Sequence, residues 1–197
     1  MSSIFFRAFE ADDYLLINKW RNDPEIQKLT GGTFRYVSSE REKEWVKDKI
    51  MNNTSDIYLA ICLNDKPMGM IGYVSINDID HIHRSAKWGG IVIDSSLYDC
   101  NPVVILIDTC ICLFNYVFME LNINRFYGLC LEEHENSKKM MTMMNMSYEG
   151  KFRKSIYKHG KYHNQLIFSI LQEDYFEMNK DARFDYKNLL KNMVKKY

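Results

Sequence analysis

The sequence has little proline and glycine, with 3 and 9 residues respectively among 197. No proline-rich, glycine-rich or low-complexity stretch divides the chain, so we do not expect a flexible linker between domains. An excess of charge of one sign is also missing, because 26 basic residues balance 26 acidic ones. Without a net field to attract polyanions, neither a nucleic-acid partner nor an anionic membrane surface is expected. The apolar share of 46% is typical of one globular domain.

A basic segment followed by a long apolar run is absent near Met1, so we expect no signal peptide and a cytoplasmic location. The longest apolar stretch covers residues 103–119, which is shorter than the roughly 20 residues that a membrane-spanning helix needs. Asp108 and Asn115 interrupt it, and a charged residue at a bilayer centre costs about 2.5–3.5 kcal/mol. The stretch therefore predicts a buried core helix rather than a membrane anchor.

Cysteine is scarce and irregularly spaced, with five residues in the chain. Cys110 and Cys112 stand two positions apart in the apolar stretch, where the side chains of a helix do not share a face. His81 and His83 lack a third ligand at a useful spacing. We therefore expect no disulfide framework and no metal, and mostly buried thiols.

The patterns that are present alternate between strands and helices. They predict strands at residues 4–9, 57–63, 70–76, 85–93, 125–131, 155–157 and 165–171, and helices at 12–22, 39–50, 102–119 and 136–146. A further polar helix is expected from about residue 181. This order predicts an α/β (α+β) fold in which a meander precedes a strand–helix–strand crossover. Such a fold has a mixed sheet covered by helices on both faces.

Three local signals accompany these elements. Ser39 and Glu42 have the spacing of a capping box at the start of the second helix. Gly89 and Gly90 are adjacent inside a strand, which predicts a bulge or a close approach of other atoms. Asn101, directly before a proline, predicts the N-cap of the apolar helix.

A series of motifs runs along the same order of elements. They are FRAFEADD (6–13), WRNDPEI (20–26), SSEREKEW (38–45), INDIDHIHRSA (76–86), ELNINR (120–125), SYEG (147–150) and HGKYHN (159–164). In this order and spacing they resemble the GNAT acetyltransferase superfamily over residues 4–175. The branch they resemble most acetylates ribosomal-protein N-termini, polyamines and amino sugars.

The resemblance implies a GNAT fold, with a central mixed, mostly antiparallel sheet of six to seven strands flanked by helices. It implies a GNAT domain at residues 1–175 and a C-terminal helical extension of the same domain at 176–197. It also implies acetyl-CoA as co-substrate. In the family the pantetheine arm lies in a gap between the fourth and fifth strands, against backbone groups that correspond to Ile91, Val92 and Ile93.

The remaining cofactor contacts agree with the family only in part. Asn136 matches the family's cofactor-contacting asparagine, although it could equally be a plain N-cap. The family's pyrophosphate loop carries glycines and a basic side chain, whereas residues 94–124 contain no glycine, lysine or arginine. The groups left to bind the pyrophosphate are the amides of Val103 and Val104 at the start of the apolar helix, together with the helix dipole.

The reaction needs a base that takes a proton from the attacking ammonium. His83, Glu132 and His134 are the candidates, and we expect them to face one cleft; the alternative for each is a solvated loop residue. The tyrosine that many relatives use as a general acid corresponds to Met143, which cannot donate a proton.

On the acceptor side, the resemblance points to Trp20, Arg21 and Asp80 as substrate-binding residues. For Trp20 the alternative is a place in the core. The apolar helix has no face suited to water, so we also expect a homodimer.

Two functional hypotheses follow from these observations. The first is an N-acetyltransferase that moves acetyl from acetyl-CoA to a primary amine by direct attack on the thioester; the acceptor is an amino sugar, a polyamine or a protein N-terminus. The second is a catalytically degenerate GNAT-fold protein that serves as a binding or scaffold module, which the altered loop favours.

Overall fold

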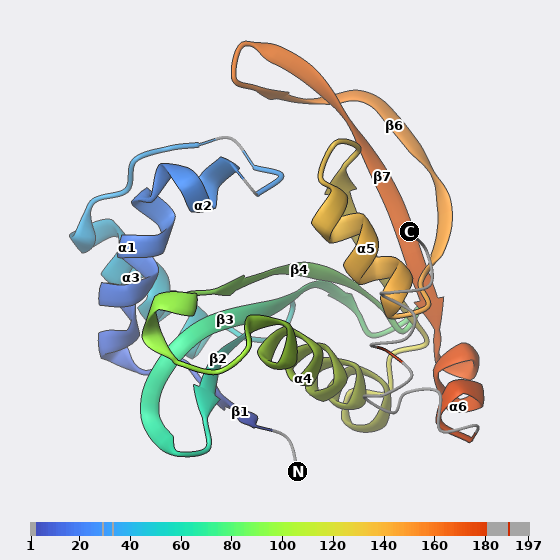
Figure 1. The fold of residues 1–197 in the computed structure, drawn as a ribbon, viewed down its shortest axis with the longest axis horizontal. Coiled ribbons are helices and arrows are strands. Elements are labelled where there is room, and N and C mark those ends of the chain that lie inside the picture. The colour runs from blue at the N-terminus through green and yellow to red at the C-terminus, as the bar shows by residue number, and fades with distance from the viewer. Residues whose placement is uncertain (1–2, 29, 33, 181–188, 190–197) are drawn as a thin grey trace.

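The computed structural model describes residues 3–28, 30–32, 34–180 and 189. Its centre is a seven-stranded sheet with the strand order β1-β2-β3-β4-β5-β7-β6 (Figure 1). The strands are β1 (Ile4–Ala8), β2 (Ile57–Leu63), β3 (Lys66–Asp80), β4 (Ser85–Ile93), β5 (Arg125–Leu131), β6 (Ser147–Lys158) and β7 (Lys161–Leu171). Only β4 and β5 pair in parallel, and the other neighbours are antiparallel. The predicted mixed, mostly antiparallel sheet flanked by helices is confirmed.

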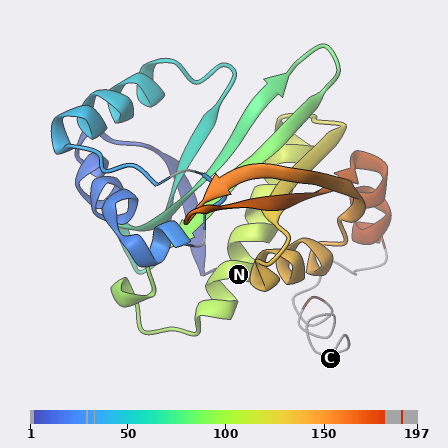
Figure 2. The same ribbon diagram turned by 90° about the horizontal axis from the view of Figure 1, so that it is seen from above.

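Helices cover both faces of the sheet (Figures 1 and 2). They are α1 (Tyr14–Asn22), α2 (Pro24–Lys28), α3 (Ser39–Met51), α4 (Pro102–Asn115), α5 (Glu135–Met143) and α6 (Gln172–Lys180). The smaller core lies between the sheet and α1 with α3, around Ile17, Trp20 and Val46. The larger core lies on the other face, under α4 and α5.

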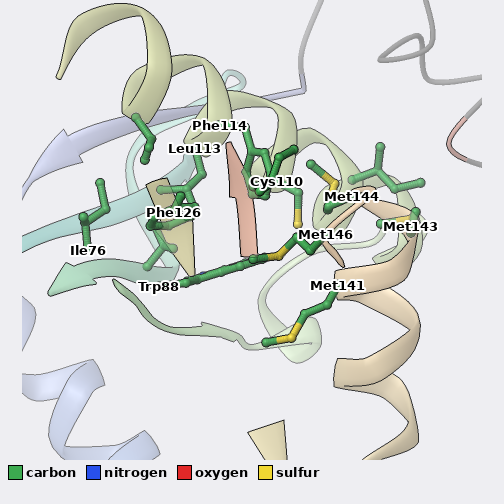
Figure 3. Packing of buried hydrophobic residues seen from close by; sticks show 14 of the residues in the cluster. Ile76, Trp88, Cys110, Leu113, Phe114, Phe126, Met141, Met143, Met144 and Met146 are labelled. Carbon is green, nitrogen blue, oxygen red and sulfur yellow. The ribbon is translucent and has the colours of Figure 1, made fainter. Parts of the chain in front are cut away.

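The larger core is built on aromatic contacts (Figure 3). Trp88 of β4 stacks on Phe126 of β5 with 6.0 Å between ring centroids, and Phe114 of α4 meets the edges of both rings. Four methionines fill the space beside them, and all are almost completely buried: Met141, Met143, Met144 and Met146. Met143 therefore lies in the core.

The apolar helix continues from α4 into a wider turn at Tyr116–Glu120. By length and composition this helical segment could cross a membrane. Its residues Ile105, Ile107 and Leu113, however, are fully buried in the larger core. The predicted core helix is thus in place.

Several element boundaries in the structure differ from the predicted ones. Strand β3 continues to Asp80 where a loop was expected, and β6 already begins at Ser147, so the last hairpin is much longer than predicted. Helix α2 was not predicted. The predicted capping box is wrong, because Ser38 is the N-cap of α3 and accepts a hydrogen bond from the Arg41 amide at 3.3 Å. Glu42 then lies one position too far along the helix to cap it.

At the C-terminal end, α6 crosses the predicted domain boundary at residue 175. Tyr175 and Met178 of this helix are buried in the larger core. The helix predicted from about residue 181 lies outside the described residues. The five cysteines are free thiols; Cys100 is exposed, whereas Cys62, Cys110 and Cys130 are buried.

Candidate active site

The central feature of the sheet is the place where β4 and β5 part. They pair over four residues, from Ser85 with Arg125 to Trp88 with Gly128. Beyond these residues, β4 pairs only with β3 and β5 only with β7. We call the separation between residues 89–93 of β4 and 129–131 of β5 the wedge. The predicted cofactor residues Ile91, Val92 and Ile93 all belong to it, and one edge of their strand has no partner strand.

A bulge at the base of the wedge, directly after the last residue of β4 that pairs with β5, bends β4. Ser75 pairs with Gly90, and the next residue of β3 pairs with Trp88, so Gly89 is the extra residue. A Cβ atom at Gly89 would lie 1.5 Å from Asn77 Oδ1 and 2.3 Å from Ser75 Oγ, so a larger residue would require both side chains to move. Gly90 has a φ of 144°, a backbone angle that residues with a Cβ atom rarely adopt. The predicted bulge is confirmed, and it turns the end of β4 away from β5.

The start of α4 is the predicted pyrophosphate end. Asn101 is the N-cap, as predicted, and its side chain accepts a hydrogen bond from the Val103 amide at 2.9 Å. The Val104 amide donates to the Asn101 carbonyl at 3.0 Å. Both amides proposed for phosphate binding therefore already have acceptors. A phosphate at this helix start would have to displace the Asn101 side chain from the Val103 amide.

Asp94, directly after β4, holds the loop that leads to α4. Its carboxylate accepts hydrogen bonds from Trp20 Nε1 at 2.9 Å and from the Ser96 amide at 3.0 Å. Burial alone would raise the pKa of Asp94, but these hydrogen bonds and nearby Lys19 lower it to about 2. Trp20, which is 1% exposed, is thus a core residue that ties α1 to this loop. Of the two interpretations of Trp20, a substrate-binding residue or a core residue, the structure supports the second.

Two of the predicted residues meet at the start of α5, beside the end of β5. His134 occupies the N-cap position, and its Nδ1 lies 2.7 Å from Ser137 Oγ. Burial, together with the charge of Lys158, lowers the pKa of His134, so its ring is neutral at neutral pH. Asn136 is exposed in the first turn and, within the described part of the chain, its side chain has no hydrogen bond. It is therefore available to a ligand and is not the N-cap.

Glu132, the third residue near this end of the sheet, is held by other side chains. It accepts hydrogen bonds from Lys151 Nζ at 2.5 Å and Asn164 Nδ2 at 2.6 Å. These contacts lower the pKa of Glu132, with Lys151 the main cause. A carboxylate with a lowered pKa is a weaker base than an ordinary one, so His134 suits the role better.

The long β6–β7 hairpin reaches across to α2 (Figures 1 and 2). Lys158, only 4% exposed, donates from Nζ to the carbonyls of Gln27 and Thr30, both at 2.5 Å. Behind it, buried His163 places Nε2 3.0 Å from the Lys158 carbonyl and its other ring nitrogen against Glu133. The hairpin is thus fastened to the opposite side of the molecule.

The structure does not bring His83 and Asp80 to the wedge. They form a pair at the β3–β4 turn, with Nδ1 and Oδ2 2.8 Å apart, and the His83 side chain is 77% exposed. Because β4 and β5 run parallel, the start of β4 and the end of β5 lie at opposite ends of the sheet. From Ser85 to Ile91 the strand covers about 20 Å. His83 and His134 therefore do not face one cleft, which corrects that expectation.

A pocket of about 360 Å³ lies on the side of the sheet covered by α1 and α3. It is lined by Arg21, Gln27, Arg35, Tyr36, Val37, Arg41 and Trp45. Arg21, predicted on the acceptor side, places its guanidinium 4.3 Å from the Trp45 ring centroid. Its Nε lies 3.2 Å from an oxygen of Glu42, which is completely buried. Burial raises the pKa of Glu42, and Arg21 opposes that rise.

Comparison with known proteins identifies this arrangement. Residues 3–147 match the family model described as Acetyltransferase (GNAT) domain. The chain belongs to this family. Among curated proteins it is similar to the putative ribosomal N-acetyltransferase YdaF of Bacillus subtilis (strain 168), with 24% identity over 106 residues. That match covers 54% of this chain and 56% of the relative.

Solved GNAT-family structures have the same fold. Spermidine N-acetyltransferase from Vibrio cholerae in complex with CoA and spermine matches with a TM-score of 0.78 and 22% identity, over 88% of this chain and 98% of that one. A chimera of that enzyme, SpeG, with hSSAT matches with a TM-score of 0.77 and 21% identity, over 89% and 99%.

GNAT acetyltransferases use acetyl-CoA as co-substrate, and the structure can be tested for its fit. The unpaired edge of β4 at Ile91–Ile93 and the free Asn136 side chain suit the pantetheine arm. At the pyrophosphate end, the helix start offers amides that Asn101 already caps, with no basic side chain in residues 94–124. The fit is therefore good at the reacting end of the cofactor and poor at its phosphates. Among the described residues, no group of three His, Cys, Asp or Glu side chains is placed to hold a metal.

Sequence reasoning missed several polar residues of this region. Arg35 and Lys158 stood in no motif, and Arg41 and Glu42 lay in patterns that gave them no role at a site. No local signal marked them, because the pocket and the Lys158 contacts bring together distant parts of the chain.

Proposed function

We propose that this GNAT-family protein transfers acetyl from acetyl-CoA to a primary amine, which could be an amino sugar, a polyamine or a protein N-terminus. The single observation that carries the proposal is the wedge with neutral His134 at its end. There, a strand edge with no partner and a basic ring nitrogen lie at the same end of β5.

The chain's own residues can supply the positioning and the proton transfer. Amides on the wedge edge of β4 are placed to donate to a thioester carbonyl oxygen, and so to stabilise the charge that develops on it. The deprotonated amine nitrogen forms a bond to the carbonyl carbon, the carbon–sulfur bond breaks, and CoA leaves as a thiolate that takes up the second proton lost by the amine nitrogen. In the tautomer whose Nδ1–H donates a hydrogen bond to Ser137 Oγ, Nε2 of His134 can accept a proton from the ammonium.

A second function has its own supporting observation. The capped amides at the start of α4 and the lack of basic residues favour a GNAT-fold binding module that no longer uses acetyl-CoA. Under this alternative the wedge would be a feature of the fold that binds no cofactor.

Calorimetric titration of the protein with acetyl-CoA and with desulfo-CoA separates the two. We expect micromolar binding of both ligands, weakened about tenfold in Asn136→Ala, together with thiol release when a primary amine is added. An absence of binding at millimolar ligand would overturn the acetyltransferase proposal and leave the binding module.

A further inference from the structure

The pocket beside α1 carries three arginines and, among the described residues that line it, no acidic side chain. Arg35 and Arg41 are exposed, and no carboxylate in the described chain pairs with either guanidinium. By contrast, Arg7 pairs with Asp13 and Arg125 pairs with Glu149. The pocket is therefore a local cationic site in a chain whose net charge is zero.

Neighbouring residues build this pocket in a defined shape. The backbone of Val37, next to Tyr36, forms three hydrogen bonds of 2.8 Å with α1. Its carbonyl accepts from the side-chain amides of Asn18 and Asn22, and its amide donates to Asn22 Oδ1. The third cation, Arg21, is fixed by Glu42 behind it and by the Trp45 ring beside it. The loop that carries Arg35 is thus held over Arg21 before any ligand arrives.

Two series of interactions link residues of the pocket to residues at the wedge. Arg21 interacts with Tyr73 of β3, which pairs with Val92 at the end of β4. Gln27, on another wall, accepts the hydrogen bond of Lys158, whose charge acts on His134. A molecule whose amine lay at the wedge would therefore extend its remaining groups toward the arginines.

We infer that the acceptor carries an oxyanion, a phosphate or a carboxylate, and that Arg35 and Arg41 bind it while the amine lies at the wedge. Guanidinium groups bind both oxyanions with paired hydrogen bonds, and they repel a polyamine. The inference rests on the proposed function and selects among its acceptors, against spermidine and similar polycations.

The test uses matched pairs of amines that differ in one anion. Glucosamine is compared with glucosamine 6-phosphate, and alanine amide with alanine, with spermidine as the cationic case. Binding is measured by calorimetry and acetylation by thiol release. We expect the anionic member of at least one pair to be preferred about tenfold or more, since hydrogen bonds to charged groups are the strong ones. The pair that responds distinguishes phosphate from carboxylate.

The variant Arg35→Gln/Arg41→Gln should abolish that preference and leave the affinity for desulfo-CoA unchanged. Lys47→Gln is the matched control, because Lys47 lies on the same helix and is 72% exposed. It should keep the preference.

Three outcomes would overturn the inference: no preference for either anionic member, tighter binding of spermidine, or a double variant that loses desulfo-CoA affinity while keeping its acceptor preference. The last would assign the arginines to the phosphates of CoA. If no amine is acetylated, the proposed function fails, and the calorimetric preference still decides the pocket.

Discussion

Among single residues, His134 is the one whose protonation state matters most for the proposed reaction. Its pKa lies below the ordinary value of about 6.5. The ring is therefore neutral, and able to accept a proton, until the pH falls through that lowered pKa. We expect kcat to fall on the acid side below pH 6.5. His134→Gln should lower kcat about 100-fold or more and remove this acid limb.

The pH–rate profile of His83→Gln is the comparison. Both histidines were candidates from the sequence, but His83 lies at the far end of β4, so its variant should keep the acid limb and most of the rate. An acid limb that persists in the His134 variant, with kcat unchanged, would show that another group is the base.

Residues such as these show where sequence reasoning works. Asn136 and His134 were expected beside the end of the fifth strand and the start of the next helix, where the structure has them, and their roles stay predictions. Trp20 could be interpreted in two ways, and only its hydrogen bond to Asp94, 74 positions away, resolves its place as a core residue. The arginine pocket could not be predicted, since its members come from α1, α3 and the loop between α2 and α3.

At the scale of elements, the Lys158 side chain attaches the β6–β7 hairpin to the end of α2 and the residues that follow it. Replacing Lys158 by Met keeps the apolar stem but leaves the carbonyls of Gln27 and Thr30 without their donor. We expect a loss of about 1.5–3 kcal/mol in the free energy of unfolding, measured by urea denaturation. Amide hydrogen exchange should accelerate in α2 and in the hairpin.

Lys161→Met is the matched control, because Lys161 is exposed at the turn of the same hairpin. Its stability should change by no more than about 0.5 kcal/mol. Equal losses in the two variants would mean that the Lys158 hydrogen bonds contribute nothing measurable.

The elements themselves were largely predictable, because apolar periodicity reflects burial on one face. The failures have local causes. Strand β6 carries mostly exposed side chains, so its apolar pattern is weak. The start of α3 was misplaced by one residue, because Ser38 and Ser39 are equally good caps and only the direction of Glu42 into the core decides between them.

At the scale of the whole molecule, the oligomeric state stays a prediction. The outer side chains of α4, including Val103, Leu106 and Ile111, are only partly buried within the chain. An apolar helix that is covered incompletely favours a second copy as its cover. We expect light scattering at micromolar concentration to give a mass of about 47 kDa, twice the 23.5 kDa of one chain. A mass of 23.5 kDa would contradict the homodimer.

The separation of β4 from β5 also determines how the two halves of the sheet are connected. One half of the sheet, β1 to β4, is joined to the other half by four residue pairs at the base of the wedge and by Lys158 near its mouth. Movement of the β6–β7 hairpin away from α2 would therefore break both hydrogen bonds of the Lys158 ammonium group.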